Sequence, residues 1–217
     1  MEHHFWLQKW QKNEIGFHLP NVNPSLVEHF HLLNLKSAAT PNFKPRILLP
    51  LCGKTLDIDW LLAQGYSVAG AELSRIAIED LFKNLNLTPV IKILGEVTLF
   101  SAANIDVFVC DIFKLTSAML GTVHAVYDRA ALVALPSETR KPYTAHLSAL
   151  TNHAPQLLIC FEYDQNLLAG PPFSINEQEV RQHYQDNYAI SLLASKPLAN
   201  GIKGLCPATE HVWRLTP

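Results

Sequence analysis

The sequence predicts a doubly wound α/β fold: a mostly parallel sheet with an antiparallel edge and helices on both faces. First, strand-like and helix-like segments alternate through most of the chain, which is typical of parallel strands joined by right-handed crossovers. Second, the strand-like runs are continuously apolar, as in a sheet covered on both faces. Third, the last two extended segments are separated by few residues, which predicts antiparallel pairing at that edge.

The bulk composition indicates an ordinary globular domain. The chain has 217 residues, 48% of them apolar and 17% charged, and its formal net charge is −2. We expect one domain over residues 1–217, in which residues 1–35 form an N-terminal aromatic and helical flap. The charge balance argues against nucleic acid or a membrane surface as a partner. No apolar run reaches the length of a membrane span or a signal peptide, so a cytoplasmic monomer is the expectation.

The cysteines and histidines give no metal-binding pattern. None of the four cysteines forms a CxxC pair, and the ten histidines show neither HExxH nor Cys/His spacing. We therefore expect buried free thiols in a reducing compartment, and no metal site.

The N-terminal part of the chain precedes the alternating pattern. Residues 5–23 are rich in aromatic side chains. Residues 25–35 predict a helix, and the side chains expected on its buried face are Leu26, Val27, Phe30 and Leu33. The Pro, Ser and Ala content of residues 36–45 predicts a loop.

The expected secondary structure then follows in order. Extended segments are predicted at 46–51, 66–72, 89–94, 97–100, 105–111, 124–132, 156–164, 188–197 and 210–217. Helices are predicted at 56–64, closed by Gly65; after the N-cap Ser74 as far as Leu85; around 137–150; and at 175–185.

A glycine turn and an acid predict a ligand site at the carboxyl ends of the strands. Gly53 follows the first strand and permits either a close approach of ligand to backbone or an ordinary tight turn. Glu72 ends the second strand, 19 residues after Gly53. An acid at about this distance grips the two hydroxyls of a ribose. The alternative for Glu72 is a solvated acid at a strand end.

The glycine turn lacks the full GxGxxG pattern. Lys54, Thr55 and Leu56 stand where further glycines would hold a pyrophosphate. This favours a ligand without phosphate, such as S-adenosyl-L-methionine. Asp111 ends another strand, where it either meets an adenine amino group or caps the following turn.

Further candidates lie outside this turn. Trp6, Trp10 and Phe17 predict a flap over a sulfonium cation, or alternatively a helix packed on the sheet. In DRAAL, Arg129 predicts a contact to an anionic acceptor or to the donor, or alternatively a surface pair with Asp128. The prolines of residues 170–175 predict a stiff loop that forms a pocket wall.

Several motifs together resemble the thiopurine S-methyltransferase family, especially its bacterial members. They are FWLQKWQKNEIGFH, RILLPLCGKTLDIDWLLAQGYSVAGAELS, VYDRAALVALP, EYDQNLLAGPPFSI and EHVWRL, which cover residues 5–187 and the last strand. The resemblance implies a Rossmann-like class I methyltransferase fold with a seven-stranded sheet, and S-adenosyl-L-methionine as donor. Residues 198–209 match no family pattern, which leaves the choice of acceptor open.

The resemblance also implies roles for individual residues. The implied acceptor is the sulfur of thiopurines or of other aromatic and heterocyclic thiols. Bacterial relatives are also linked to selenium and tellurium species, and so to detoxification. Implied donor contacts are Trp10, Leu51, Glu72 and Arg129; Asp111 and Ile112 would meet the adenine; Phe17 and Pro172 would line the acceptor pocket.

The expected reaction is an in-line displacement of the methyl group by the acceptor sulfur. Because a thiolate is already a strong nucleophile, alignment and exclusion of water are the main tasks of the protein. We expect Arg129 to act in catalysis by holding the anionic acceptor. Two other classes share the strand, turn and acid: an NAD-type dinucleotide-dependent oxidoreductase and a non-catalytic nucleotide-binding protein.

Overall fold

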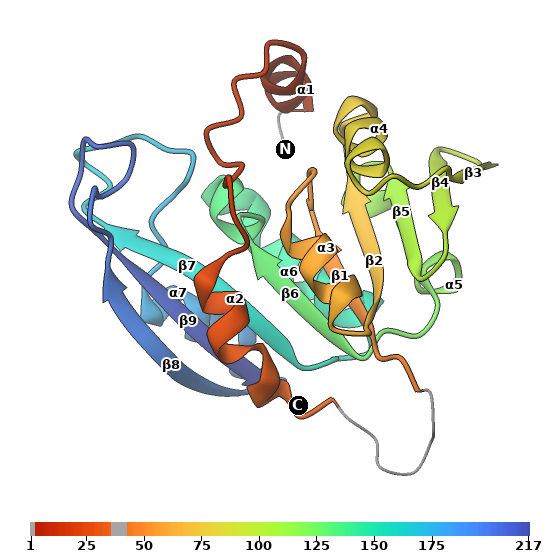
Figure 1. Cartoon of the computed structure of the whole chain (residues 1–217). Helices are drawn as coiled ribbons and strands as arrows, with labels where there is room; N and C mark the ends of the chain where they lie inside the picture. Colours follow the sequence, from red (N-terminus) through yellow and green to blue (C-terminus); the bar gives the residue numbers. More distant parts are fainter. Residues whose placement is uncertain (1–2, 36–42) are drawn as a thin grey trace.

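One mixed sheet of nine strands forms the centre of the molecule (Figure 1). The computed structural model describes residues 3–35 and 43–217. The strand order is β3-β4-β5-β2-β1-β6-β7-β9-β8. The strands are β1 (Arg46–Pro50), β2 (Ser67–Glu72), β3 (Val90–Leu94), β4 (Val97–Ala102), β5 (Ile105–Val109), β6 (Ala125–Arg129), β7 (Gln156–Tyr163), β8 (Ala189–Pro197) and β9 (Ala208–Thr216).

Five central strands are parallel and both edges are antiparallel. β5, β2, β1, β6 and β7 pair in parallel. β9 and β8 continue the sheet antiparallel beyond β7, so the predicted antiparallel edge is confirmed. β4 and β3 add a second antiparallel edge beside β5, which was not predicted.

The expectation of seven strands is therefore wrong, and the hairpin of β3 and β4 accounts for the difference. Gly95, with φ +66°, makes the turn between these strands. The side chains of Val90 and Ile93 on β3 are 61% and 79% exposed. A strand that covers no part of the core can be added at an edge without changing the central order. All nine extended segments predicted from the sequence form strands.

Helices cover the two faces of the sheet (Figure 1). α2 (Pro24–His29), the 3-10 helix η1 (Phe30–Leu33), α3 and α4 contribute to one apolar cluster with one face. α6 and α7 contribute to a second cluster with the other face. Their bounds are α3 (Asp57–Ala63), α4 (Arg75–Asn84), α6 (Ser137–Leu150) and α7 (Glu177–Tyr184); the short elements η2 (Ile112–Lys114), α5 (Ser117–Leu120) and η3 (Leu132–Ala134) connect strands.

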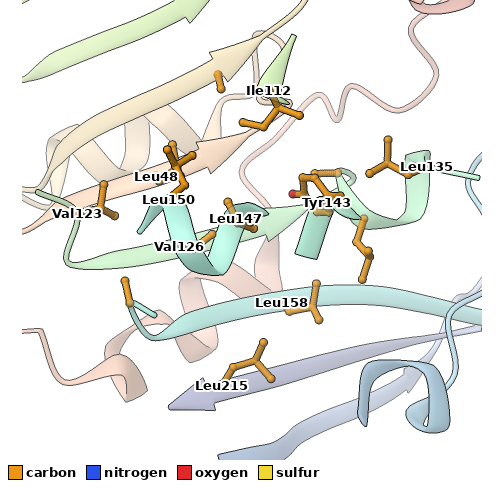
Figure 2. Packing of buried hydrophobic residues seen from close by; sticks show 14 of the residues in the cluster. Leu48, Ile112, Val123, Val126, Leu135, Tyr143, Leu147, Leu150, Leu158 and Leu215 are labelled. Atoms are coloured by element: carbon orange, nitrogen blue, oxygen red, sulfur yellow. The ribbon is translucent and has the colours of Figure 1, made fainter. Parts of the chain in front are cut away.

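The packing of α6 shows how the second face is filled. Figure 2 shows Tyr143 and Leu147 of α6 beside side chains of the sheet. Leu147, Val126 and Leu158 are fully shielded from solvent. Burying a side chain of this size contributes about 1.5–3 kcal/mol to folding. The helix predicted around 137–150 is confirmed.

The segment predicted as one helix at 25–35 is divided in two. α2 ends at His29 and η1 continues to Leu33, after which Asn34 adopts φ +53°. Leu26, Phe30 and Leu33 are buried as expected. The expectation for Val27 is wrong, because its side chain is 49% exposed. Adjacent helical residues point about 100° apart, so Val27 faces away when Leu26 faces the sheet.

All four cysteines are buried and free, as the sequence predicts. Burial raises the pKa of the thiols of Cys52 and Cys160 well above the ordinary value. Residues 36–42 of the predicted loop lie outside the described residues. Within the described ranges, no helix combines the length and apolar character needed to cross a membrane.

Candidate active site

A cavity of about 760 Å³ lies at the carboxyl ends of β1, β2 and β6, beneath the N-terminal segment. This volume is in the range of small-molecule sites, and switch points of parallel sheets are where such sites occur. Seven of the eight residues with implied roles line the cavity: Trp10, Phe17, Leu51, Glu72, Ile112, Arg129 and Pro172. Asp111 is not among its lining residues.

The turn after β1 is closely covered by an aromatic ring. Leu51 and Gly53 both have left-handed backbone, with φ +47° and +53°. A Cβ atom on Gly53 would lie 2.9 Å from Cζ2 of Trp10. Glycine is therefore required here both for its conformation and for its lack of a side chain. The group that approaches Gly53 in the structure is Trp10, and the close approach of a ligand to this backbone stays a prediction.

Glu72 is a buried carboxylate that closes the same turn. Its Oε2 accepts a hydrogen bond from the amide of Gly53 at 2.8 Å, and its Oε1 accepts one from the amide of Ser74 at 2.8 Å. Burial raises the pKa of Glu72, and these two amide donors oppose the rise. Each carboxylate oxygen has a second lone pair and can accept a further hydrogen bond. Glu72 is thus not a solvated acid; it is held with acceptor capacity at the cavity.

The N-terminal aromatic residues lie above the cavity. α1 (His3–Gln11) lies beyond the end of β2, close to α4 (Figure 1). Trp10 is its buried residue. The ring of Phe17 makes edge contacts with Trp6 and Trp10, with centroid distances of 5.6 and 5.4 Å. α1 belongs to the cavity wall and not to the two apolar clusters of the sheet faces.

Arg129 ties this aromatic segment to β6. Its Nη1 donates a hydrogen bond to the carbonyl oxygen of Phe17 at 3.0 Å. Its Nε is buried and has no hydrogen-bond partner among the described residues. The guanidinium therefore holds the flap, and Arg129 also lines the cavity.

The alternative of an Asp128–Arg129 surface pair is wrong. Asp128 is fully buried, and its carboxylate accepts hydrogen bonds from the hydroxyl of Tyr143 at 2.7 Å and from the amide of Leu132 at 3.1 Å. Burial raises the pKa of Asp128 to about 6. The two neighbours thus have different roles. Asp128 is hydrogen-bonded inside the core, and Arg129 lines the cavity.

Asp111 adopts the capping arrangement that the sequence left open. Its carboxylate accepts a hydrogen bond from the amide of Phe113 at 3.1 Å and lies 3.0 Å from Nε2 of His3. The neighbouring Ile112 lines the cavity. The adenine contact implied for Asp111 stays a prediction.

The cavity wall includes part of residues 198–209, the segment outside the motifs that carry the resemblance. Four residues of 198–209 line the cavity, namely Leu198, Gly201, Ile202 and Lys203. Pro172 lies in the same wall, where its carbonyl oxygen accepts a hydrogen bond from Tyr163 at 2.6 Å. Residues 198–209 therefore border the cavity.

A polar network in the cavity wall was missed by the sequence reasoning. Asp57 accepts hydrogen bonds from the amide of Asn23 at 2.8 Å and from the hydroxyl of Tyr127 at 3.0 Å. Ser25 donates to Glu210 at 2.6 Å. Tyr127 and Glu210 belong to motifs that carry the resemblance, VYDRAALVALP and EHVWRL, which is the signal that could have found them.

His18 was also missed, although it follows Phe17 directly. Burial lowers its pKa, and the positive charges of Lys54 and Arg129 lower it further. His18 lines the cavity. Its lowered pKa favours the neutral ring at neutral pH. In the part of the chain that the structure describes, no group of three or more His, Cys, Asp and Glu side chains could hold a metal ion.

Comparisons with known proteins agree with this geometry. The family model described as thiopurine S-methyltransferase matches residues 1–216. The thiopurine S-methyltransferase of Xanthobacter autotrophicus is 52% identical over 216 residues, covering 99% of both chains. That of Teredinibacter turnerae is 47% identical over 216 residues, covering 100% of this chain and 98% of the relative.

A solved structure supports the fold. The 1,6-didemethyltoxoflavin-N1-methyltransferase of Burkholderia thailandensis, with S-adenosylhomocysteine bound, superposes with a TM-score of 0.64 at 15% identity. The match covers 99% of this chain and 87% of that one. The arrangement of sheet and helices is therefore that of class I methyltransferases. With the family model matching almost every residue, the chain belongs to the thiopurine S-methyltransferase family.

Proposed function

We propose that this protein transfers a methyl group from S-adenosyl-L-methionine to the sulfur of thiopurines and of other aromatic or heterocyclic thiols. The observation that carries the proposal is the buried carboxylate of Glu72, which closes the Gly53 turn beneath Trp10. Relatives at 47% and 52% identity bear the name of this activity. The turn has a single glycine instead of a cluster, which suits a donor that has no phosphate.

We propose separate contacts for the ribose, the adenine and the sulfonium of the donor. Glu72 would accept hydrogen bonds from the ribose hydroxyls. Ile112 would pack on the adenine, with Asp111 near its amino group. When bound, S-adenosyl-L-methionine supplies an electrophilic methyl group on a positively charged sulfur. Trp10 offers an aromatic face to such a cation.

The acceptor side has apolar walls and one strong donor. Phe17 and Pro172 would hold an aromatic ring, and Arg129 would favour an acceptor sulfur that carries negative charge. The flap over the cavity excludes water from the reacting atoms. Alignment and desolvation are thus supplied by the fold, and no group is required to activate a thiolate.

An acceptor panel with labelled donor tests the proposal. Purified protein would be incubated with methyl-labelled S-adenosyl-L-methionine and, separately, 6-mercaptopurine, 4-nitrothiophenol, selenite and tellurite. We expect transfer to both thiols; transfer to selenium or tellurium would extend the acceptor range. No transfer to either thiol would contradict the proposal. A calorimetric titration with S-adenosylhomocysteine and with NAD separates the alternatives, because an NAD-dependent oxidoreductase would bind NAD.

A further inference from the structure

Glu210 presents an unused carboxylate oxygen to the acceptor side of the cavity. It lies near the start of β9, directly opposite Phe161 of β7 in the antiparallel ladder. Phe161 and Glu210 both line the cavity. Ser25 of α2 donates a hydrogen bond to Oε1 of Glu210 at 2.6 Å. Within residues 3–35 and 43–217, Oε2 has no hydrogen-bond partner, and it is not shut off from solvent.

No cation neutralises this carboxylate in the described structure. Lys196 lies opposite Glu210 on β8, but its ammonium pairs with Glu28 at 2.5 Å. The other acid of this wall, Asp57, already accepts hydrogen bonds at both oxygens, from Asn23 and from Tyr127. Of these two acids, Glu210 is the one with an oxygen that accepts no hydrogen bond from the described residues, so this oxygen has both lone pairs available for a bound molecule.

We propose that Glu210 binds the ring N–H of heterocyclic thiol acceptors and takes up its proton during methyl transfer. The inference rests on the proposed function and specifies the acceptor that the site prefers. Thiopurines exist largely as thiones, in which the sulfur is double-bonded to carbon and the neighbouring ring nitrogen carries the hydrogen. A carboxylate is a strong acceptor for such a donor.

The proton transfer balances the reaction of a neutral thione. The thione sulfur forms a bond to the methyl carbon, while the bond from that carbon to the donor sulfur breaks and leaves its electron pair there. As these bonds form and break, the ring nitrogen passes its proton to Glu210, which gives a neutral methylthio heterocycle. Glu210 finally releases the proton to solvent. Thiophenols have no ring N–H, so the same carboxylate gives them no help.

The other ionisable groups at the cavity have different positions or roles. Arg129 binds the carbonyl of Phe17, and His18 lies beside Lys54 and Arg129, which disfavour its protonated form. Lys203 lines the cavity from the 198–209 segment. The thione sulfur gains electron density as the N–H proton leaves. Positive charge from Arg129 and Lys203 would stabilise that sulfur, while the carboxylate of Glu210 accepts the proton from the ring nitrogen.

Glu210→Gln is the central test, since the amide oxygen can still accept the hydrogen bond from Ser25. With 6-mercaptopurine as acceptor, we expect kcat/KM to fall by about 10- to 100-fold, the range for losing a hydrogen bond to a charged group. With 4-nitrothiophenol, we expect the wild-type value. Equilibrium binding of 6-mercaptopurine to the complex with S-adenosylhomocysteine should weaken, while S-adenosylhomocysteine itself should bind unchanged.

Two controls separate this role from a structural one. Glu162→Gln changes an acid on β7 that pairs with His211 and does not line the cavity, so both acceptors should be unaffected. The pH profile is the second readout: with 6-mercaptopurine, Glu210→Gln should lose activity about tenfold per unit below the pKa of the acceptor, because only the ionised acceptor reacts. The wild-type profile should fall less steeply.

Each outcome decides the inference. Equal losses for both acceptors, or no loss for 6-mercaptopurine, would overturn it. If Glu210→Gln does not fold, Ser25→Ala replaces it, because removing the orienting hydroxyl should selectively slow 6-mercaptopurine by a few-fold; absence of that selectivity would overturn the inference. A wild-type protein that methylates neither thiol would instead contradict the proposed function.

Discussion

Oε2 of Glu72 accepts a hydrogen bond from the amide of Gly53 at 2.8 Å, so the end of β2 holds the turn that follows β1. The two residues are 19 positions apart in the chain. They meet because β1 and β2 pair in parallel, so that the turn after β1 lies beside the end of β2. The same carboxylate that is proposed to bind the donor also fixes the backbone beneath it. Binding and preorganisation are thus combined in one side chain.

Replacing Glu72 by Ala should weaken donor binding strongly. The change removes the proposed acceptor for the ribose and leaves the amides of Gly53 and Ser74 without a partner. We expect the Kd for S-adenosylhomocysteine to rise by about 10- to 150-fold, measured by calorimetry. Glu79→Ala, an exposed acid on α4, should bind like the wild type. An unchanged Kd for Glu72→Ala would refute the assignment.

Gly53→Ala should reduce donor binding, whereas Gly65→Ala should not. Both glycines have positive φ, so either change costs about 1–2 kcal/mol of backbone strain and lowers Tm by a few degrees. Only the new Cβ at position 53 meets Trp10, at 2.9 Å; the one at position 65 has nothing within 4 Å. Calorimetry with S-adenosylhomocysteine would distinguish them. Equal affinities in the two variants would argue against a role for Trp10 in covering the donor.

Arg129→Lys should loosen the flap and slow transfer. Lysine keeps the charge but lacks the planar group that reaches the carbonyl of Phe17. We expect kcat/KM for 4-nitrothiophenol to fall about 10-fold, with faster chymotrypsin cleavage in the aromatic N-terminal segment. Arg75→Lys, an exposed residue that pairs with Glu79, is the matched control. Wild-type rates in both assays would show that Arg129 neither holds the flap nor assists transfer.

The free energy of unfolding of the wild type should fall relative to that of the Asp128→Asn variant as pH rises. Burial raises the folded-state pKa from 3.8 to about 6, with the largest opposing effect from the hydroxyl of Tyr143. A raised pKa means that the stability contribution of Asp128 is fully present below about pH 4 and is lost as pH rises through 6. The difference corresponds to about 3 kcal/mol at most.

Urea unfolding at pH 4, 5, 6 and 7 measures this effect. The free energy of unfolding of the wild type, minus that of Asp128→Asn, should decrease along the series and level off above pH 6. Asp186→Asn, which changes an exposed acid, should show no such trend. A constant difference across the series would mean that the pKa of Asp128 is not raised in the native state.

The sequence predicted the central sheet well because the signals there are local. Continuous apolar runs located β1 and β6, and the separation of Gly53 and Glu72 located the donor side of the cavity. The number of strands was not predictable from the class resemblance, since an added edge hairpin depends on what lies beside β5. The position of Val27 was missed because Leu26 and Val27 are adjacent in one helix and cannot both face the sheet.

The acceptor side was less predictable, because its residues meet only in three dimensions. Ser25 and Glu210 are 185 positions apart, yet they share a hydrogen bond. The wall formed by 198–209 has no regular periodicity from which its place could be read. Asp128 was difficult for another reason. The sequence left a surface pair with Arg129 open as an alternative, but Asp128 is buried and accepts a hydrogen bond from the hydroxyl of Tyr143.

The exposed β3 hairpin has a consequence for solubility. An edge strand with apolar side chains on its surface is a template for pairing with another molecule. Lys92 occupies the middle of β3, so an antiparallel pair of two such strands centred on it would oppose two ammonium groups. This one charge acts as a gatekeeper against edge-to-edge aggregation, and Lys92→Ile should lower the concentration at which the protein remains dispersed.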